Sequence, residues 1–137
     1  MVNRPAWRGR GIARILLALF YAGAGILHLA LPQPFVTVTP PWVPMPDLVV
    51  ALTGVAELLG AAGLVQGFSP GLRRAAGWGL AAYALCVWPA NFQHMALDLA
   101  RPDYGLGLGY HVPRLAAQPL LIWLALWAGG AIGRHAD

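Results

Sequence analysis

Glu57 is the residue whose type and position most clearly suggest a functional site in this chain. It lies near the centre of an apolar stretch, residues 47–66, that is long enough to cross a bilayer as a helix. A carboxylate at that depth is costly unless another group pairs with it, and such carboxylates often mark binding sites in membrane proteins. We therefore expect Glu57 to have partners on neighbouring helices.

Six further polar residues fall in the outer half of the predicted helices. With a rise of about 1.5 Å per residue and the outer helix ends taken as level, these residues and Glu57 form a gradient from about 5 Å to about 14 Å below the outer boundary. From the boundary inward the set is His28, His94 and Arg114, then Asn91 and Gln118, then Tyr21 with Glu57. The inner half is interpreted as apolar, so the gradient predicts a blind pocket that opens outward and not a pore.

Helix faces support the same grouping. Glu57 shares its face with the small residues Gly54 and Gly60, which allow another helix to approach closely. Tyr21, Gly25 and His28 form a similar stripe on the first predicted helix, which indicates that both faces point into the bundle.

Two interpretations of this polar set remain open. Glu57 is either the floor of a ligand pocket or a structural residue that holds four helices in register by pairing with Tyr21, Arg114 or Gln118. The chain contains no recognisable catalytic motif, so catalytic residues stay unassigned and an enzyme acting on its own is not expected. For His28 and His94 we expect hydrogen bonds, because their spacing resembles no compact metal motif. No metal site is predicted, and haem ligation by these two histidines is disfavoured.

A single cysteine limits the possible redox chemistry. Cys86 cannot form a dithiol and disulfide cycle within one chain, which disfavours a membrane thiol oxidase. We expect it to be a small buried apolar residue.

The composition is that of a chain that lives in lipid. Hydrophobic residues make up 58% of the 137 residues, charged residues only 10%, and the mean hydropathy is +0.61. Four apolar windows of about 20 residues are each long enough to span a bilayer. We therefore predict an all-α fold, an integral membrane four-helix bundle that forms one domain over residues 1–137. Its helices are expected at residues 12–31, 48–66, 75–97 and 113–132, and the proline-rich residues 32–46 are expected to form a non-helical outer loop.

The positions of the arginines predict the orientation of the chain. If the four helices alternate in direction, only Arg101 and Arg114 lie on one side of the membrane. The other side has Arg4, Arg8, Arg10, Arg14, Arg73, Arg74 and Arg134. This excess predicts that the N and C termini are cytoplasmic. The net charge of +4 is then explained by topology, and no nucleic-acid partner is expected.

Five segments together resemble the DoxX-like family of small four-helix membrane proteins. They are GILH at 25–28, PPWVPMP at 40–46, TGVAELLGAAGLV at 53–65, WPANFQHM at 88–95 and RLAAQPLLIW at 114–123. The resemblance covers almost the whole chain and implies the same four-helix fold, in the plasma (inner) membrane of a bacterium. Relatives in that family include a subunit of a thiosulfate:quinone oxidoreductase and a membrane partner of oxidative-stress enzymes.

The leading functional hypothesis is an accessory membrane protein of redox metabolism. Its outward pocket would bind a small lipophilic ligand, for which a quinone is the first candidate. The alternative is a non-catalytic assembly or scaffold protein whose polar cluster is structural. Proton-coupled transport is less favoured because the charged residues do not continue into the inner half. Expected partners are the lipid bilayer, a membrane or peripheral oxidoreductase, and further copies of the same chain.

Overall fold

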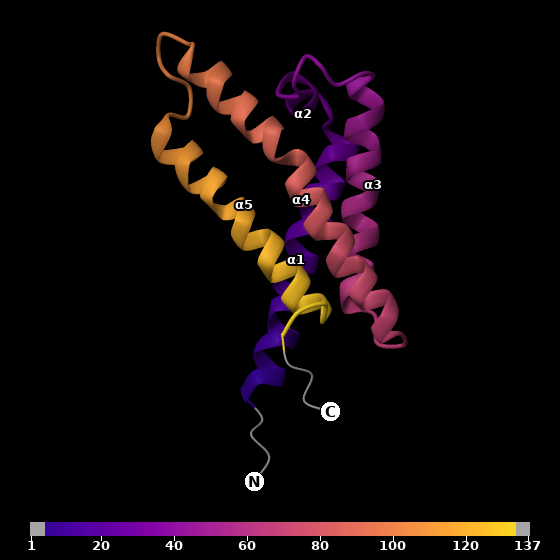
Figure 1. The fold of residues 1–137 in the computed structure, drawn as a ribbon. Helices are drawn as coiled ribbons and strands as arrows, with labels where there is room; N and C mark the ends of the chain where they lie inside the picture. Colours follow the sequence, from indigo (N-terminus) through magenta and orange to yellow (C-terminus); the bar gives the residue numbers. More distant parts are fainter. Residues whose placement is uncertain (1–4, 134–137) are drawn as a thin grey trace.

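A computed structural model describes residues 5–133, which form five α-helices and no strand within that range (Figure 1). The all-α expectation is confirmed. The helices are α1 (Pro5–Ala30), α2 (Gln33–Thr37), α3 (Pro46–Val65), α4 (Pro70–Leu99) and α5 (Leu108–Gly129).

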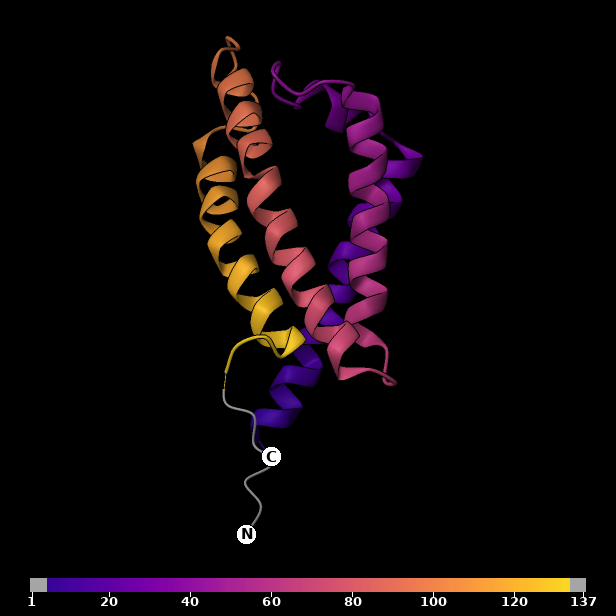
Figure 2. The ribbon, with the colours of Figure 1, turned by 45° about the vertical axis from the view of Figure 1, so that its right-hand side comes forward.

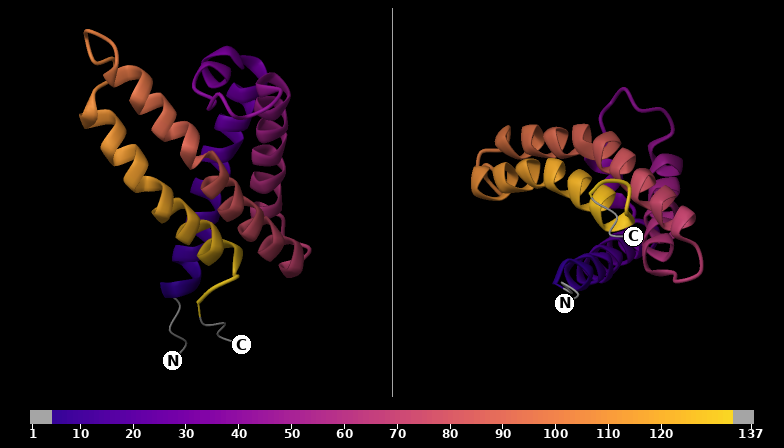
Figure 3. Two further views of the ribbon diagram at one scale, coloured as in Figure 1. Left: turned by 45° about the horizontal axis from the view of Figure 1, so that its top comes forward. Right: turned by 60° about the horizontal axis from the view of Figure 1, so that its bottom comes forward.

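The four long helices form two antiparallel pairs, α1 with α3 and α4 with α5. The start of α1, the turn between α3 and α4, and the end of α5 lie at one end of the molecule, and α2 lies at the other (Figure 1). The two pairs meet toward the first end and diverge toward α2, as Figures 2 and 3 show from other directions. We refer to these ends as the arginine-rich end, after Arg14, Arg73 and Arg74, and the α2 end.

Small residues set the distances between helices. A Cβ added to Gly25 of α1 would lie 2.7 Å from the carbonyl oxygen of Gly54 in α3, and one added to Gly54 would lie 2.9 Å from the Cβ of His28. Between α4 and α5, a Cβ on Gly77 would lie 2.7 Å from the carbonyl oxygen of Ala125. Only glycine permits backbones to approach this closely, so the sequence determines where each pair of helices touches.

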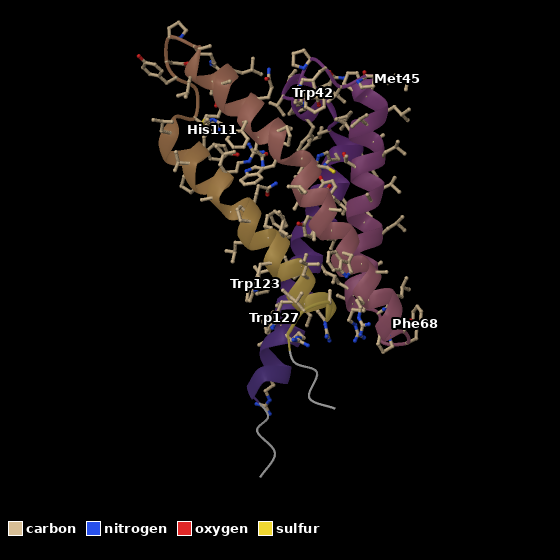
Figure 4. The ribbon with its side chains drawn as sticks, viewed as in Figure 1. Trp42, Met45, Phe68, His111, Trp123 and Trp127 are labelled. Carbon is tan, nitrogen blue, oxygen red and sulfur yellow. The ribbon has the colours of Figure 1, made fainter. Side chains whose placement is uncertain are left out.

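Two arginine contacts join α1 to the end of α5. Arg14 Nε donates to the carbonyl oxygen of Ala128 at 2.7 Å, and Arg10 Nη2 donates to that of Ile132 at 3.4 Å. The Arg10 guanidinium also lies 5.3 Å from the centre of the Trp127 ring. These donors satisfy carbonyl groups near the α5 C-terminus that have no intrahelical partner. Figure 4 shows Trp127 and Trp123 near this end, opposite Trp42 and Met45.

Several expected helix boundaries need correction. Helices α1 and α4 begin at Pro5 and Pro70, earlier than the expected residues 12 and 75, because their arginine-containing ends, which the apolar windows excluded, are helical too. The segment 32–46, predicted to lack helix, contains the short helix α2, because Pro34 lies in its first turn, where a missing N–H costs nothing. Helix α5 begins at Leu108 and not at residue 113, after Gly107 has turned the chain with φ +72°. Pro113 is therefore inside the helix.

Pro119 removes one backbone hydrogen bond from α5, and a side chain of α4 replaces it. The carbonyl oxygen of Leu115 would normally accept from residue 119, which as proline has no N–H. It accepts instead from Trp88 Nε1, at 3.1 Å. The proline and the tryptophan, 31 positions apart, together fix the contact between the two helices.

Two helical segments, Arg8–Ala30 and Pro46–Val65, are long and apolar enough to cross a membrane. Their mean hydropathies are 1.8 and 2.1, yet only 22% and 33% of their most apolar windows are buried within the chain. Large apolar side chains therefore face outward along them, including Leu16, Leu19 and Leu59, which are 61%, 66% and 68% exposed. Helices α4 and α5 overlap the other two predicted spans, and α4 carries more polar side chains than α1 or α3.

Candidate functional site

A cavity of about 630 Å³ lies between the two helix pairs, where they diverge. Its lining includes six of the seven residues predicted to form a pocket: Tyr21, His28, Glu57, Asn91, Arg114 and Gln118. The seventh, His94, lies outside the lining and contacts it through Arg114. The lining also includes the exposed side chains of Phe20, Trp42 and Leu120, so the cavity opens along an apolar border.

Glu57 is 3% exposed and its carboxylate is held by two side chains from two other helices. The Tyr83 hydroxyl of α4 donates to Oε1 at 2.7 Å, and Nδ1 of His28 in α1 lies 2.9 Å from Oε2. The expected partners Tyr21, Arg114 and Gln118 are not the ones observed. Three helices therefore meet at this carboxylate.

The position of His28 Nδ1 indicates which ring nitrogen carries the hydrogen. Nδ1 lies 2.8 Å from the carbonyl oxygen of Ala24 and 2.9 Å from Glu57 Oε2. A backbone carbonyl only accepts hydrogen bonds, so Nδ1 must be an N–H and is shared between the two oxygens. The angle favours Ala24, which leaves Oε2 without a well-aligned donor. Phe35 of α2 stacks on the His28 ring at 3.8 Å between ring centres and holds it in place.

His28 reaches Glu57 because side chains lean toward the N-terminus of their own helix. Helices α1 and α3 are antiparallel, so His28 leans away from the α2 end and Glu57 leans toward it. Counted from the Gly25 and Gly54 contact, α1 continues for five residues to Ala30 and α3 begins eight residues earlier at Pro46, so α3 extends beyond α1 by about three residues or roughly 4.5 Å of rise. By the same count the predicted ends at residues 31 and 48 are level, so the lean of the two side chains is what brings His28 closer to Glu57 than depth alone predicts.

Tyr21 contributes a hydroxyl that has no hydrogen-bond partner among the described residues. The side chain is 2% exposed and lines the cavity. Its ring packs edge-on against Tyr83, with ring centres 6.0 Å apart. A buried hydroxyl without a partner is unfavourable, so Tyr21 offers the cavity an unused donor and acceptor close to Glu57.

Gln118 and Arg114 have other partners from α4. Gln118 Nε2 donates to the carbonyl oxygen of Ala84 at 2.9 Å. Arg114 Nη1 donates to His94 Nδ1 at 2.8 Å and lies over the Tyr110 ring. The arginine thus has no carboxylate within ion-pair distance among the described residues and places a positive charge on the cavity wall.

Besides the group around Glu57, a second polar cluster lies at the α2 end of the α4 and α5 pair and contacts Arg114 through His94. Its members are His94 and Asp98 of α4 and the fully buried His111 of α5, labelled in Figure 4. His111 Nε2 lies 2.8 Å from Asp98 Oδ2, and His94 Nε2 lies 3.6 Å from the same oxygen. The backbone N–H of Leu106 also donates to Oδ2 at 3.0 Å.

Sequence reasoning missed Tyr83 and His111 as site residues. Tyr83 lies in the stretch interpreted as apolar, although its hydroxyl was a visible signal. His111 lies in α5, which begins at Leu108, five residues before the expected start at residue 113. Cys86 also differs from expectation: it is exposed, along the cavity lining, and not buried.

Comparison with known proteins gives one family match. Residues 17–129, which include α3, α4 and all the residues of both polar clusters, match the family described as "Domain of unknown function (DUF8561)". The chain belongs to the DUF8561 family. No curated protein and no solved structure gave a significant match. For this DUF8561 protein, function is therefore inferred from the cavity and its lining.

Proposed function

We propose that this DUF8561 protein is an integral membrane protein whose cavity binds a small lipophilic molecule with a polar head, such as a quinone. In this proposal it acts as an accessory protein of a membrane oxidoreductase. The observation that carries the proposal is a cavity with an apolar border and a buried carboxylate, Glu57, at its floor.

The pattern of exposure supports a membrane location. A soluble protein would bury its most apolar helices, whereas about two thirds or more of the most apolar windows in α1 and α3 face outward. Lipid is the solvent in which such surfaces are favourable. We infer that α1, α3, α4 and α5 are the four spans.

The orientation follows from the arginines. The arginine-rich end would face the cytoplasm, which places both termini there and the α2 end outside, in the plasma membrane of a bacterium. The cavity then lies in the outer half of the bilayer, with its apolar border in contact with lipid.

The chemistry of the lining suits a ring with oxygen substituents. Glu57 accepts hydrogen bonds, the free Tyr21 hydroxyl donates or accepts, and Arg114 is positively charged at the wall. Apolar side chains such as Val50, Val87 and Leu121 form much of the rest of the surface. A few polar groups in an apolar cavity of this size are typical of sites for small amphipathic ligands.

The link to redox metabolism, and to an oxidoreductase partner or to self-association, rests on the DoxX-like motifs. The family description carries no activity. These parts of the proposal are therefore tested by what co-purifies with the protein.

The test is quinone binding by the purified full-length protein in lipid nanodiscs. We expect saturable binding of a ubiquinone or menaquinone analogue. Glu57→Gln should lose at least about tenfold in affinity, which equals a loss of about 1.4 kcal/mol in binding free energy. Asp47→Asn is the matched control, because it removes an exposed carboxylate from the same helix. If wild type, Glu57→Gln and Asp47→Asn all fail to bind any quinone, the ligand assignment is wrong.

A structural role is the alternative, and one observation favours it. Glu57, Tyr83 and His28 connect α3, α4 and α1 by direct side-chain contacts. A scaffold would show reduced thermal stability in Glu57→Gln with no quinone binding in the wild type, together with a stoichiometric partner in crosslinking.

A further inference from the structure

We propose that His94, Asp98 and His111 form a site for a divalent transition-metal ion of the zinc class at the α2 end of the α4 and α5 pair. This site is separate from the floor of the cavity. It does not depend on the identity of the lipophilic ligand.

The donor set is one that such ions prefer. Two imidazoles and one carboxylate bind zinc and related divalent ions, and the remaining coordination positions are filled by water or another ligand. His94 and Asp98 are four residues apart on α4 and so lie on the same helix face. His111 comes from α5, which makes the site dependent on the pairing of the two helices.

The distances are close to those that a metal requires. One ligand atom from each of the three residues lies within 4.8 Å of the others. A tetrahedral ion with bonds of about 2.0–2.1 Å holds its ligand atoms roughly 3.3 Å apart. The observed separations from Asp98 Oδ2, 2.8 Å to His111 and 3.6 Å to His94, fall on either side of that value. Shifts of side chains by about 1 Å are enough to admit the ion.

The surroundings hold the carboxylate in place. Gly105, at φ +54°, packs against Asp98 so closely that any Cβ there would collide with the carboxyl group. The Leu106 N–H fixes Oδ2, and His111 is fully buried. His111 Nε2 carries the hydrogen that Asp98 Oδ2 accepts, so a metal that binds Nε2 replaces this hydrogen bond, and the hydrogen moves to the unpartnered Nδ1 or is released to solvent.

Arg114 opposes metal binding at His94. It donates to Nδ1 at 2.8 Å, so the ring hydrogen is on Nε2, the atom nearer Asp98. When a metal binds Nε2, that hydrogen moves to Nδ1 and Arg114 must withdraw. Removing the arginine should therefore strengthen binding, since both a competing donor and a nearby positive charge are lost.

The test is zinc binding by the full-length protein in detergent after treatment with a chelator. We expect inductively coupled plasma mass spectrometry to find one zinc per chain. The affinity for zinc should fall at least about tenfold in His94→Gln and in Asp98→Asn. Arg114→Met should bind zinc more tightly than the wild type. Asp103→Asn is the control, because Asp103 is an exposed carboxylate in the connection between α4 and α5 and pairs with Arg101. Circular dichroism verifies that each variant is folded.

X-ray absorption at the zinc edge of the wild type provides evidence that needs no variant. A shell of nitrogen and oxygen atoms at about 2.0–2.1 Å with two imidazoles supports the site. Absence of zinc, a shell without two imidazoles, or equal affinity in the ligand variants and in Asp103→Asn would overturn it. Quinone binding is measured separately, so either proposal can fail alone.

Discussion

At the scale of single residues, the main feature is how Glu57 is accommodated away from water. A buried carboxylate is costly, and the chain compensates with a hydroxyl from α4 and an imidazole N–H from α1. Hydrogen bonds to a charged group contribute more than neutral ones, about 1.5–3 kcal/mol each. One carboxylate oxygen is fully engaged by Tyr83, whereas the other is only partly satisfied and remains available to a ligand.

The Tyr83 hydroxyl should therefore be important for stability. Tyr83→Phe leaves Glu57 Oε1 without its donor, and we expect it to lower the free energy of unfolding by about 1–3 kcal/mol. Unfolding of the detergent-solubilised protein by heat or denaturant measures the change. Tyr104→Phe, at an exposed position of the α4 and α5 connection, should have little effect. Equal stability of the two variants would contradict the role assigned to Tyr83.

At the scale of helices, glycines decide the register in which the cavity forms. The contact between Gly25 and Gly54 aligns α1 with α3 so that His28 and Glu57 meet. The contact between Gly77 and Gly129 closes α4 on α5 near the arginine-rich end, and the pairs diverge from there. The width of the cavity thus depends on residues that do not line it.

Two glycines of α1 give a matched pair of substitutions. Gly25→Ala forces a Cβ against the Gly54 carbonyl oxygen, and we expect a loss of about 1–3 kcal/mol and weaker contact between His28 and Glu57. At Gly23 nothing lies within 4 Å of an added Cβ, so Gly23→Ala should be neutral or stabilise the helix by up to about 1 kcal/mol. Thermal unfolding of both variants under the same conditions tests this difference. Similar melting temperatures would show that the close approach does not control the packing.

At the scale of the whole molecule, the proposed membrane orientation rests on charge and hydropathy together. Arg14, Arg73 and Arg74 gather at one end, whereas the cavity and both polar clusters lie toward the other. In the proposed orientation, an outward cavity with an apolar border and a closed arginine-rich end would suit capture of a ligand from the outer leaflet. It does not suit conduction across the membrane.

Labelling of introduced thiols should reveal this orientation. In a Cys86→Ser background, Ser69→Cys in the turn between α3 and α4 should react with an impermeant maleimide only in inverted vesicles. Tyr104→Cys, in the connection between α4 and α5, should react only in intact spheroplasts. The two sites lie at opposite ends of the helices (Figure 1). Labelling of both residues from the same side would rule out the four-span topology.

The sequence alone determined the class of the fold, the approximate helices and six of the polar residues that line the cavity. Apolar runs, proline positions and small-residue stripes are local properties, so they can be read directly from the chain. Glu57 was recognisable as a site residue because a carboxylate in an apolar helix is costly wherever its partners are.

Only the tertiary structure decided the pairings. His28 reaches Glu57 because of the register of α1 against α3 and the direction in which the two side chains lean. Tyr83 reaches it from α4. The depth of each residue along its own helix predicts neither contact. The cluster of His94, Asp98 and His111 likewise exists only because α5 starts early enough to bring His111 opposite α4. Glycines in the sequence indicate which helix faces can approach closely, but which glycine meets which is decided by contacts between residues far apart in the chain and has no local signal.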